Sequence, residues 1–277
     1  MDERPTPGIV IGPMGIGEVV DRGITLARRN YRLLAMIAAW AVVPGYAIQA
    51  ILTAATLSTL SSSSSGSLSA VGSAVAGTGL GGLIAGIASA IASIALVVAC
   101  GKLVDPKREP DVLTPGSVYS AATSRLVPLI LLSLIYGATA IPLFIVFPLG
   151  VYVWVRWANA YVIVVLEKQG PIAALGRSWA LTRSLWWHTA IVVVIAWVAV
   201  TFVEISMAGV LSLAIQGMAV VLEAPIIAAV LNAVVQAAVN VTVTPFSVAI
   251  AVVLYYELRA RTEGYDLEQR MLRIAPT

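Results

Sequence analysis

The fold is decided by residues 33–101, which read LLAMIAAWAVVPGYAIQAILTAATLSTLSSSSSGSLSAVGSAVAGTGLGGLIAGIASAIASIALVVACG. This stretch contains no acidic or basic residue and no histidine. One helical crossing of a bilayer needs about 20 apolar residues, so the stretch is long enough for more than one crossing. We expect two membrane-spanning helices, at residues 33–57 and 74–100, with a kink at Pro44 and a serine-rich turn at residues 61–67.

The composition of the whole chain is that of a membrane protein. Of its 277 residues, 59% are hydrophobic and 11% are charged, whereas an average soluble domain has roughly 25% charged residues. The net charge of +3 then informs on orientation in the membrane, and we expect no nucleic acid as a partner. One cysteine and one histidine exclude an intramolecular disulfide and the usual zinc, haem and iron–sulfur ligand sets, so we expect no metal and no cofactor.

Two further apolar regions hold the remaining crossings. Residues 126–166 carry Arg156 as their only charge and have prolines near the middle, which predicts a hairpin of two spans. Residues 189–256 are interrupted by two glutamates only, and we expect two more spans there, with the outer connection at residues 216–225. The polar segment at residues 102–125 is predicted to be a loop on the solvent side.

The basic residues decide that the number of spans is six. Every Lys and Arg except Arg156 lies before the first span, between the second and third, between the fourth and fifth, or after the last. Six spans put all four segments on the cytoplasmic side, as the positive-inside rule requires. A seventh span within residues 208–230 would move four arginines to the outer side, so we reject it.

The sequence therefore predicts an all-helical, polytopic protein of the prokaryotic cytoplasmic (inner) membrane with both termini in the cytoplasm. Its six transmembrane helices form three hairpins with amphipathic interfacial helices. We expect a cytoplasmic N-terminal segment at residues 1–32, a membrane domain at residues 33–257 and a cytoplasmic tail at residues 258–277. The first 32 residues have no apolar core of the length that a cleavable signal peptide needs.

The segments before the odd-numbered spans resemble one another. Residues 17–40 align with residues 174–197 without a gap, and residues 116–136 follow the same plan. In the first copy apolar residues recur every three or four positions with charges opposite, which is typical of a helix in the headgroup layer. Three copies of an interfacial helix and a hairpin would account for the chain, although any short basic linker before a span looks similar.

Three stretches resemble a known family. They are IGEVVDRGITLARRNYRLL at residues 16–34, AALGRSWALTRSLWWHT at residues 173–189 and LYYELRARTEGYDLE at residues 254–268. Together they are similar to the membrane domain that in some bacteria precedes a glycerophosphodiester phosphodiesterase catalytic domain, and to its stand-alone prokaryotic relatives. The resemblance implies a membrane architecture and no catalytic residue. The His-Arg-Gly motif of the phosphodiesterase barrel is missing, since the only histidine, His188, precedes Thr189.

Two charges lie within the expected helix cores. By a rise of about 1.5 Å per residue, Arg156 lies near the middle of the bilayer, and Glu204 lies about 8 Å farther from the cytoplasmic side. A charge at that depth costs about 3 kcal/mol and normally faces protein, water or a partner. An Arg156–Glu204 pair is our first hypothesis.

The last span carries polar residues every four positions, so they share one face of the helix. The candidate intramembrane polar cluster comprises Arg156, Asn159, Glu204, Asn232, Gln236, Asn240 and Thr244. Three interpretations stay open for it: an interhelical hydrogen-bond seam, a path or site for a ligand or ion, and a subunit interface.

Two surfaces and one histidine complete the candidates. Small residues four positions apart let helices approach closely, and they predict packing within the monomer or a dimer contact at Gly82, Gly86 and Ala90. Basic residues of the cytoplasmic side either bind anionic phospholipid headgroups or only fix the orientation; they are Arg28, Arg29, Arg32, Arg177 and Arg183. We expect His188 to be a polar residue at the membrane interface.

These features favour a protein that is not an enzyme: a membrane scaffold, a lipid-contacting protein or an accessory subunit, within a homo-oligomer or a larger membrane complex. The alternative is a small transporter or channel with an intramembrane polar path, and a cavity that reaches the polar cluster would distinguish it from a scaffold with a closed core. A membrane enzyme acting on phospholipid is the third interpretation, although no catalytic constellation is visible.

Overall fold

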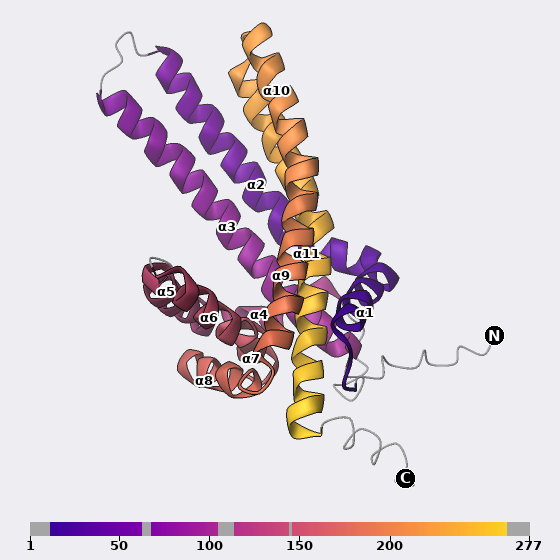
Figure 1. The fold of residues 1–277 in the computed structure, drawn as a ribbon. Coiled ribbons are helices and arrows are strands. Elements are labelled where there is room, and N and C mark those ends of the chain that lie inside the picture. The colour runs from indigo at the N-terminus through magenta and orange to yellow at the C-terminus, as the bar shows by residue number, and fades with distance from the viewer. Residues whose placement is uncertain (1–11, 63–67, 105–113, 144–145, 265–277) are drawn as a thin grey trace, which may run out of the picture. The chain divides into compact units, whose positions relative to one another are not determined.

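The computed structural model of the chain describes residues 12–62, 68–104, 114–143 and 146–264, and these residues are helical apart from short turns (Figure 1). Most of the predicted serine-rich turn, the charged segment at residues 105–113 and the terminal residues 1–11 and 265–277 lie outside this part. The all-helical fold class is therefore confirmed for the described residues.

The helices follow one another with few intervening residues. Their bounds are α1 Ile16–Arg29, α2 Tyr31–Ser62, α3 Leu68–Val104, α4 Pro115–Thr123, α5 Leu126–Leu143, α6 Phe147–Trp157, α7 Ala160–Leu166, α8 Pro171–Leu181, α9 Trp186–Glu204, a π-helix Ile205–Gly209, α10 Val210–Val221 and α11 Pro225–Glu263. The short helices α1, α4 and α8 each precede a long apolar helix, which is the order that the predicted repeat requires.

Five helical segments in the described part of the chain are long and apolar enough to cross a membrane. They are Tyr31–Leu60, Val75–Val104, Phe147–Leu166, Trp186–Val221 and Pro225–Glu263. A sixth span results if α4 and the beginning of α5, which are bent by 60° to each other, are counted together. The chain is thus a multi-pass helical membrane protein.

Several of these helices are longer than one crossing requires. The segment Trp186–Val221 has 36 residues and Pro225–Glu263 has 39. At about 1.5 Å per residue they are roughly 54 and 58 Å long, whereas the hydrocarbon core of a bilayer is about 30 Å thick. The second of them continues to Glu263, beyond the end expected near Tyr256.

The chain divides into two compact units, which we call the first and the second unit. The first unit comprises Met1–Asn30, Ile94–Val198 and Phe246–Thr277, and the second comprises Tyr31–Ser93 and Ala199–Pro245. The helices α3, α9 and α11 each contribute residues to both units.

The first unit contains the short helices. The helix α8 packs against α5, α6 and α7, and α7 is buried over its last five residues. The N-terminal helix α1 lies close to α11, because a Cβ atom added at Gly23 would lie 2.7 Å from the Cα atom of Ile250. The core includes the fully buried side chains of Tyr255, Leu258 and Ile163.

The second unit contains the hairpin of α2 and α3, the π-helix, α10 and the first part of α11. The two helices of the hairpin run antiparallel (Figure 1). They touch where Gly45 of α2 meets Ala88 of α3. Ala208, Val239 and Val243 form a small buried cluster that joins the π-helix to α11.

Two details differ from the sequence-based expectations. The segment at residues 102–125, predicted to be a loop, contains α4, whose first turn is capped by the Thr114 hydroxyl group accepting from the Ser117 N–H. The outer connection expected at residues 216–225 is shorter, because α10 continues to Val221 and α11 begins at Pro225. Proline at the first helical position favours that early start.

Candidate functional site

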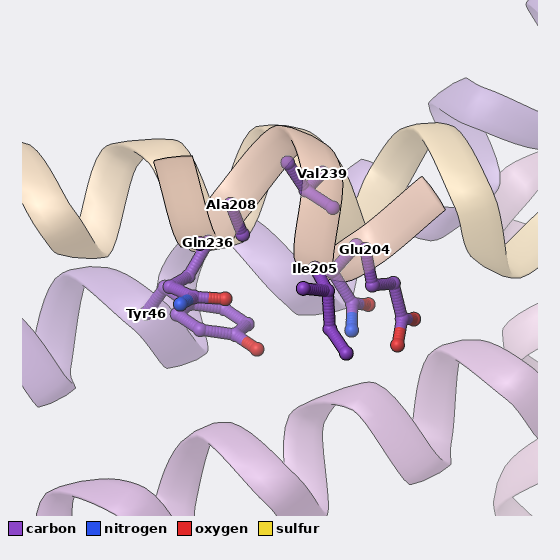
Figure 2. Close-up of a pocket in the computed structure, with 8 residues that line it drawn as sticks. Tyr46, Glu204, Ile205, Ala208, Gln236 and Val239 are labelled. Carbon is purple, nitrogen blue, oxygen red and sulfur yellow. The ribbon is translucent and has the colours of Figure 1, made fainter. Parts of the chain in front are cut away.

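Polar residues of the last two predicted spans meet at a pocket in the second unit. The pocket has a volume of about 380 Å³. Its lining residues come from α2, the end of α9, the π-helix and α11; they are Tyr46, Glu204, Ile205, Ala208, Gly209, Gln236, Val239 and Asn240. Figure 2 shows the side chains of Tyr46, Gln236 and Glu204 extending from three helical segments toward the same space. The structure thus brings together Glu204, Gln236 and Asn240 from the predicted cluster.

A change of helix type positions the acidic residue of the pocket. Glu204 is the last residue of α9, and the π-helix Ile205–Gly209 follows it directly. A π-helix inserts an extra residue into the helical turn, and such insertions occur frequently at functional sites. Here the π-helix ends with Ala208 and Gly209, two small residues that also line the pocket.

The amide residues of the pocket lie one helical turn apart on α11. Gln236 is exposed, and Asn240 is half-buried. The side chain of Asn240 accepts a hydrogen bond of 3.2 Å from the Thr244 hydroxyl group, and Asn232 donates to the carbonyl oxygen of Ala228. Both hydrogen bonds run along α11, so Thr244 supports the Asn240 side chain from the next turn, while Asn232 lies outside the pocket lining.

Sequence reasoning missed Tyr46 as a member of this site. The residue follows the Pro44-Gly45 pair, which we interpreted only as a kink, and α2 continues through both residues. The small Gly45 packs against Ala88 of α3, whereas Tyr46 lines the pocket. The Pro44-Gly45 pair directly before Tyr46 could have indicated a site here, because backbone irregularities in membrane helices often accompany binding sites.

The pocket offers a mixed set of groups for binding. It holds one carboxylate, two side-chain amides and one phenol beside the aliphatic side chains of Ile205, Ala208 and Val239. Among the described residues, neither Glu204 nor Gln236 has a side-chain hydrogen bond or an ion pair within the protein. These groups are therefore available to a polar solute that fits about 380 Å³, a size within the usual range of small-molecule sites.

Arg156 lies in the first unit and is bound there by aromatic side chains. It is 7% exposed, and its guanidinium carbon lies 5.0 Å from the ring centroids of both Tyr152 and Trp179. The guanidinium group donates to the Tyr152 hydroxyl at 2.7 Å and 3.1 Å. Because Glu204 belongs to the second unit, the Arg156–Glu204 pair stays a prediction.

Asn159 of the predicted cluster occupies the break between α6 and α7. It is 1% exposed, and neither polar atom of its side chain has a hydrogen-bond partner among the described residues. One helical turn earlier, the carbonyl oxygen of Arg156 accepts a hydrogen bond of 2.7 Å from Ser178 of α8. The break is thus stabilised from α8 rather than through Asn159.

Sequence reasoning also missed a buried glutamate in the first unit. Glu257 of α11 is completely buried and pairs with Arg261 one turn later. Its Oε1 atom lies 3.3 Å from Nε2 of His188, and Arg261 also donates to the carbonyl oxygen of Met14 before α1. The expected interfacial His188 is therefore largely buried against a carboxylate. The spacing of Glu257 and Arg261 was visible in the sequence, whereas their burial was not.

The predicted lipid-binding arginines differ in their surroundings. Arg177 pairs with Glu167 at 3.2 Å and also with Glu263, so its charge is already balanced within the protein. Tyr255 donates a hydrogen bond of 2.8 Å to the same Glu167. The other predicted arginines, Arg28, Arg29, Arg32 and Arg183, have exposed side chains.

The small-residue face of α3 is open in this structure. Gly82, Gly86 and Ala90 are exposed, and a Cβ atom added at either glycine would have no neighbouring atom within 4 Å. Contact with α2 uses other residues of α3, including Ala88. A dimer contact at this face stays a prediction.

No protein-family model, no curated protein and no solved structure matches this chain in the comparisons with known proteins. The resemblance to the membrane domain of phosphodiesterases therefore depends on its three sequence motifs alone.

Proposed function

We propose that the protein is a small transporter or channel of the cytoplasmic membrane whose path includes the pocket at Glu204. The pocket is the single observation that carries this proposal: a cavity of about 380 Å³ reaches Glu204, Gln236 and Asn240. A closed, dry core at these residues would have favoured a scaffold. The cavity favours a protein that admits a solute.

The energetic argument concerns the carboxylate. An ionisable group within a membrane segment is costly, and it normally faces a water-filled cavity, a partner or a transported species. Glu204 is half-buried at the pocket and has no protein partner among the described residues. Water or a solute in the pocket would supply the hydrogen bonds that this carboxylate needs.

The proposed topology has six spans with both termini in the cytoplasm. Five helical segments qualify as spans by length and hydropathy, and the bent pair of α4 and α5 supplies the sixth. Six spans keep the four basic segments on one side of the membrane, whereas five spans would divide them between the two sides. These segments contain Arg28, Lys102, Lys168 and Arg259, respectively.

Water access to the pocket tests the proposed function. The design compares Ile205→Cys with Phe202→Cys in a Cys100→Ala background, using a small water-soluble methanethiosulfonate on proteoliposomes. Ile205 is 65% exposed and lines the pocket, while Phe202 is 70% exposed and does not line it. The two side chains are therefore about equally exposed at the protein surface, and they differ in whether they line the pocket.

We expect rapid modification of the thiol at position 205 and slow modification at position 202, because a thiol that faces lipid tails stays protonated and meets no reagent. Equal rates at the two positions, or no modification at position 205, would contradict the proposed function. Mass spectrometry of the intact protein measures both rates.

We also propose that α1 contacts anionic lipid headgroups, as the alternative function of a lipid-contacting protein requires. The observation that favours it is the contrast between Arg177, which pairs with two glutamates, and the exposed Arg28 and Arg29 at the end of α1. The same helix buries Val19, Leu26 and Ala27 on its other face. An amphipathic helix of this kind is suited to the headgroup layer.

A further inference from the structure

The pocket lining carries one formal charge. Glu204 is its acid, and the lining contains no Lys, Arg or His. When Glu204 is ionised, an anionic solute is repelled, and a neutral solute leaves the carboxylate without a counterion in surroundings of low polarity. A monocation balances the lining, because a partly buried charge is stabilised by a partner of opposite sign.

We infer that the solute of this pocket presents an alkylammonium group; the inference rests on the proposed function and names its substrate class. A bare metal ion fits less well. Calcium takes six to eight oxygen ligands at about 2.3–2.6 Å, whereas Ile205, Ala208 and Val239 contribute carbon to a cavity of about 380 Å³. A cation with alkyl substituents uses both the charge and the apolar surface.

Each lining group has a role toward such a cation. The carboxylate of Glu204 pairs with the ammonium charge, and the face of the Tyr46 ring attracts the cation electrostatically. The amide of Gln236 binds a polar substituent of the solute. The side-chain oxygen of Asn240 already accepts from Thr244, and its second lone pair stays available.

The same chemistry has two sources in a membrane. A free amine reaches the pocket from water, whereas a phospholipid with an ethanolamine or choline headgroup reaches it from the bilayer. The recognition elements are the same for both, so the experiment separates the sources by the composition of the surrounding bilayer.

The test measures binding of radiolabelled choline to the full-length protein in nanodiscs of phosphatidylglycerol, a lipid without an ammonium group. The competitor is 3,3-dimethylbutan-1-ol, which has the shape of choline and no charge. The variant Glu204→Gln removes the pocket charge with almost no change of shape. Glu223→Gln is the matched control, because Glu223 is an exposed acid in the short turn between α10 and α11.

We expect choline to bind equally well to the wild-type protein and to Glu223→Gln. Its binding to Glu204→Gln should be at least about tenfold weaker, which corresponds to a loss of about 1.4 kcal/mol. The neutral alcohol should not compete. Replacing part of the phosphatidylglycerol by phosphatidylethanolamine should weaken choline binding more than replacing it by the same amount of an uncharged glycolipid if the lipid headgroup is the source, and equally if the source is a free amine.

Competition by the neutral alcohol at equal concentration, or unchanged choline binding by Glu204→Gln that elutes as the wild type does in size-exclusion chromatography, would overturn the inference. Absence of choline binding while the thiol at position 205 reacts rapidly would overturn it as well and leave the proposed function standing. If that thiol does not react, the proposed function itself fails.

Discussion

The guanidinium carbon of Arg156 lies 5.0 Å from the centroid of the Trp179 ring. The Tyr152 ring lies at the same distance, so two aromatic rings hold this buried charge, and the described part of the chain offers it no acidic partner. This arrangement fixes α8 against α6 in the first unit. It makes Trp179 more important for stability than its partly exposed position suggests.

We predict that Trp179→Leu lowers the free energy of unfolding by about 2 kcal/mol, because a desolvated cation–π contact has roughly that strength. Trp40→Leu is the control, since Trp40 is 70% exposed, and a surface change of this kind alters stability by less than about 0.5 kcal/mol. Unfolding by sodium dodecyl sulfate in mixed micelles measures both values. Equal losses for the two variants would contradict the role of the Arg156–Trp179 contact.

Two of the ion pairs in which an arginine lies four residues from a glutamate provide a second comparison. Glu257 is completely buried beside Arg261 and His188, whereas Glu18 is 46% exposed beside Arg22. We predict that Glu257→Gln destabilises the protein by about 3 kcal/mol, because the buried carboxylate that faces both Arg261 and His188 is lost. Glu18→Gln should cost less than about 0.5 kcal/mol.

The same unfolding assay checks this pair of variants. Limited proteolysis adds a local readout, because Arg261 also binds the Met14 carbonyl oxygen before α1. We expect faster cleavage before α1 in Glu257→Gln and an unchanged rate in Glu18→Gln. Similar stability of both variants would show that Glu257 does not organise the first unit.

The contact between α2 and α3 depends on a glycine that the sequence did not single out for packing. A Cβ atom at Gly45 would collide with the Cβ atom of Ala88, whereas a Cβ atom at Gly86 would have open space. We predict that Gly45→Ala destabilises the protein by about 1–3 kcal/mol through overpacking, and that Gly86→Ala does not destabilise it. Adding Ala88→Gly to Gly45→Ala should restore part of the loss, and its failure to do so would contradict the contact.

The lipid proposal predicts an effect of the exposed arginines at the end of α1. Arg28→Gln combined with Arg29→Gln should lower retention of phosphatidylglycerol about tenfold or more, because each basic residue near an anionic surface contributes about 1 kcal/mol. Native mass spectrometry after purification from mixed phosphatidylglycerol and phosphatidylcholine micelles counts the retained lipids. Unchanged retention would indicate that these charges only fix the orientation.

Residues that break a pattern could be identified from the sequence. Glu204 interrupts a long apolar run, and Gln236 and Asn240 repeat at the helical spacing of four residues, so their common face on one helix was predictable. The structure places both residues with Glu204 in the lining of one pocket. The role of Tyr46 was not predictable, because tyrosine is also a common residue at membrane interfaces.

Features that depend on tertiary packing could not be identified from the sequence. A π-helix such as Ile205–Gly209 has no distinct composition, and its formation depends on how the neighbouring helices pack. The burial of Glu257 likewise follows from the position of α9 and α1 beside α11 rather than from its neighbours in the sequence. Hydrophobicity therefore predicted the helices well, and their ends and buried charges less well.

The most direct test of the central claim compares two thiol reagents of opposite charge at Ile205→Cys, one with a trimethylammonium group and one with a sulfonate group. The ratio of the two rates, divided by the same ratio for a free thiol in solution, reports both water access and the influence of Glu204. We predict that the cationic reagent is favoured by about tenfold, which corresponds to about 1.4 kcal/mol, and that Glu204→Gln abolishes this preference. No reaction with either reagent, or a preference that persists in Glu204→Gln, would contradict the account.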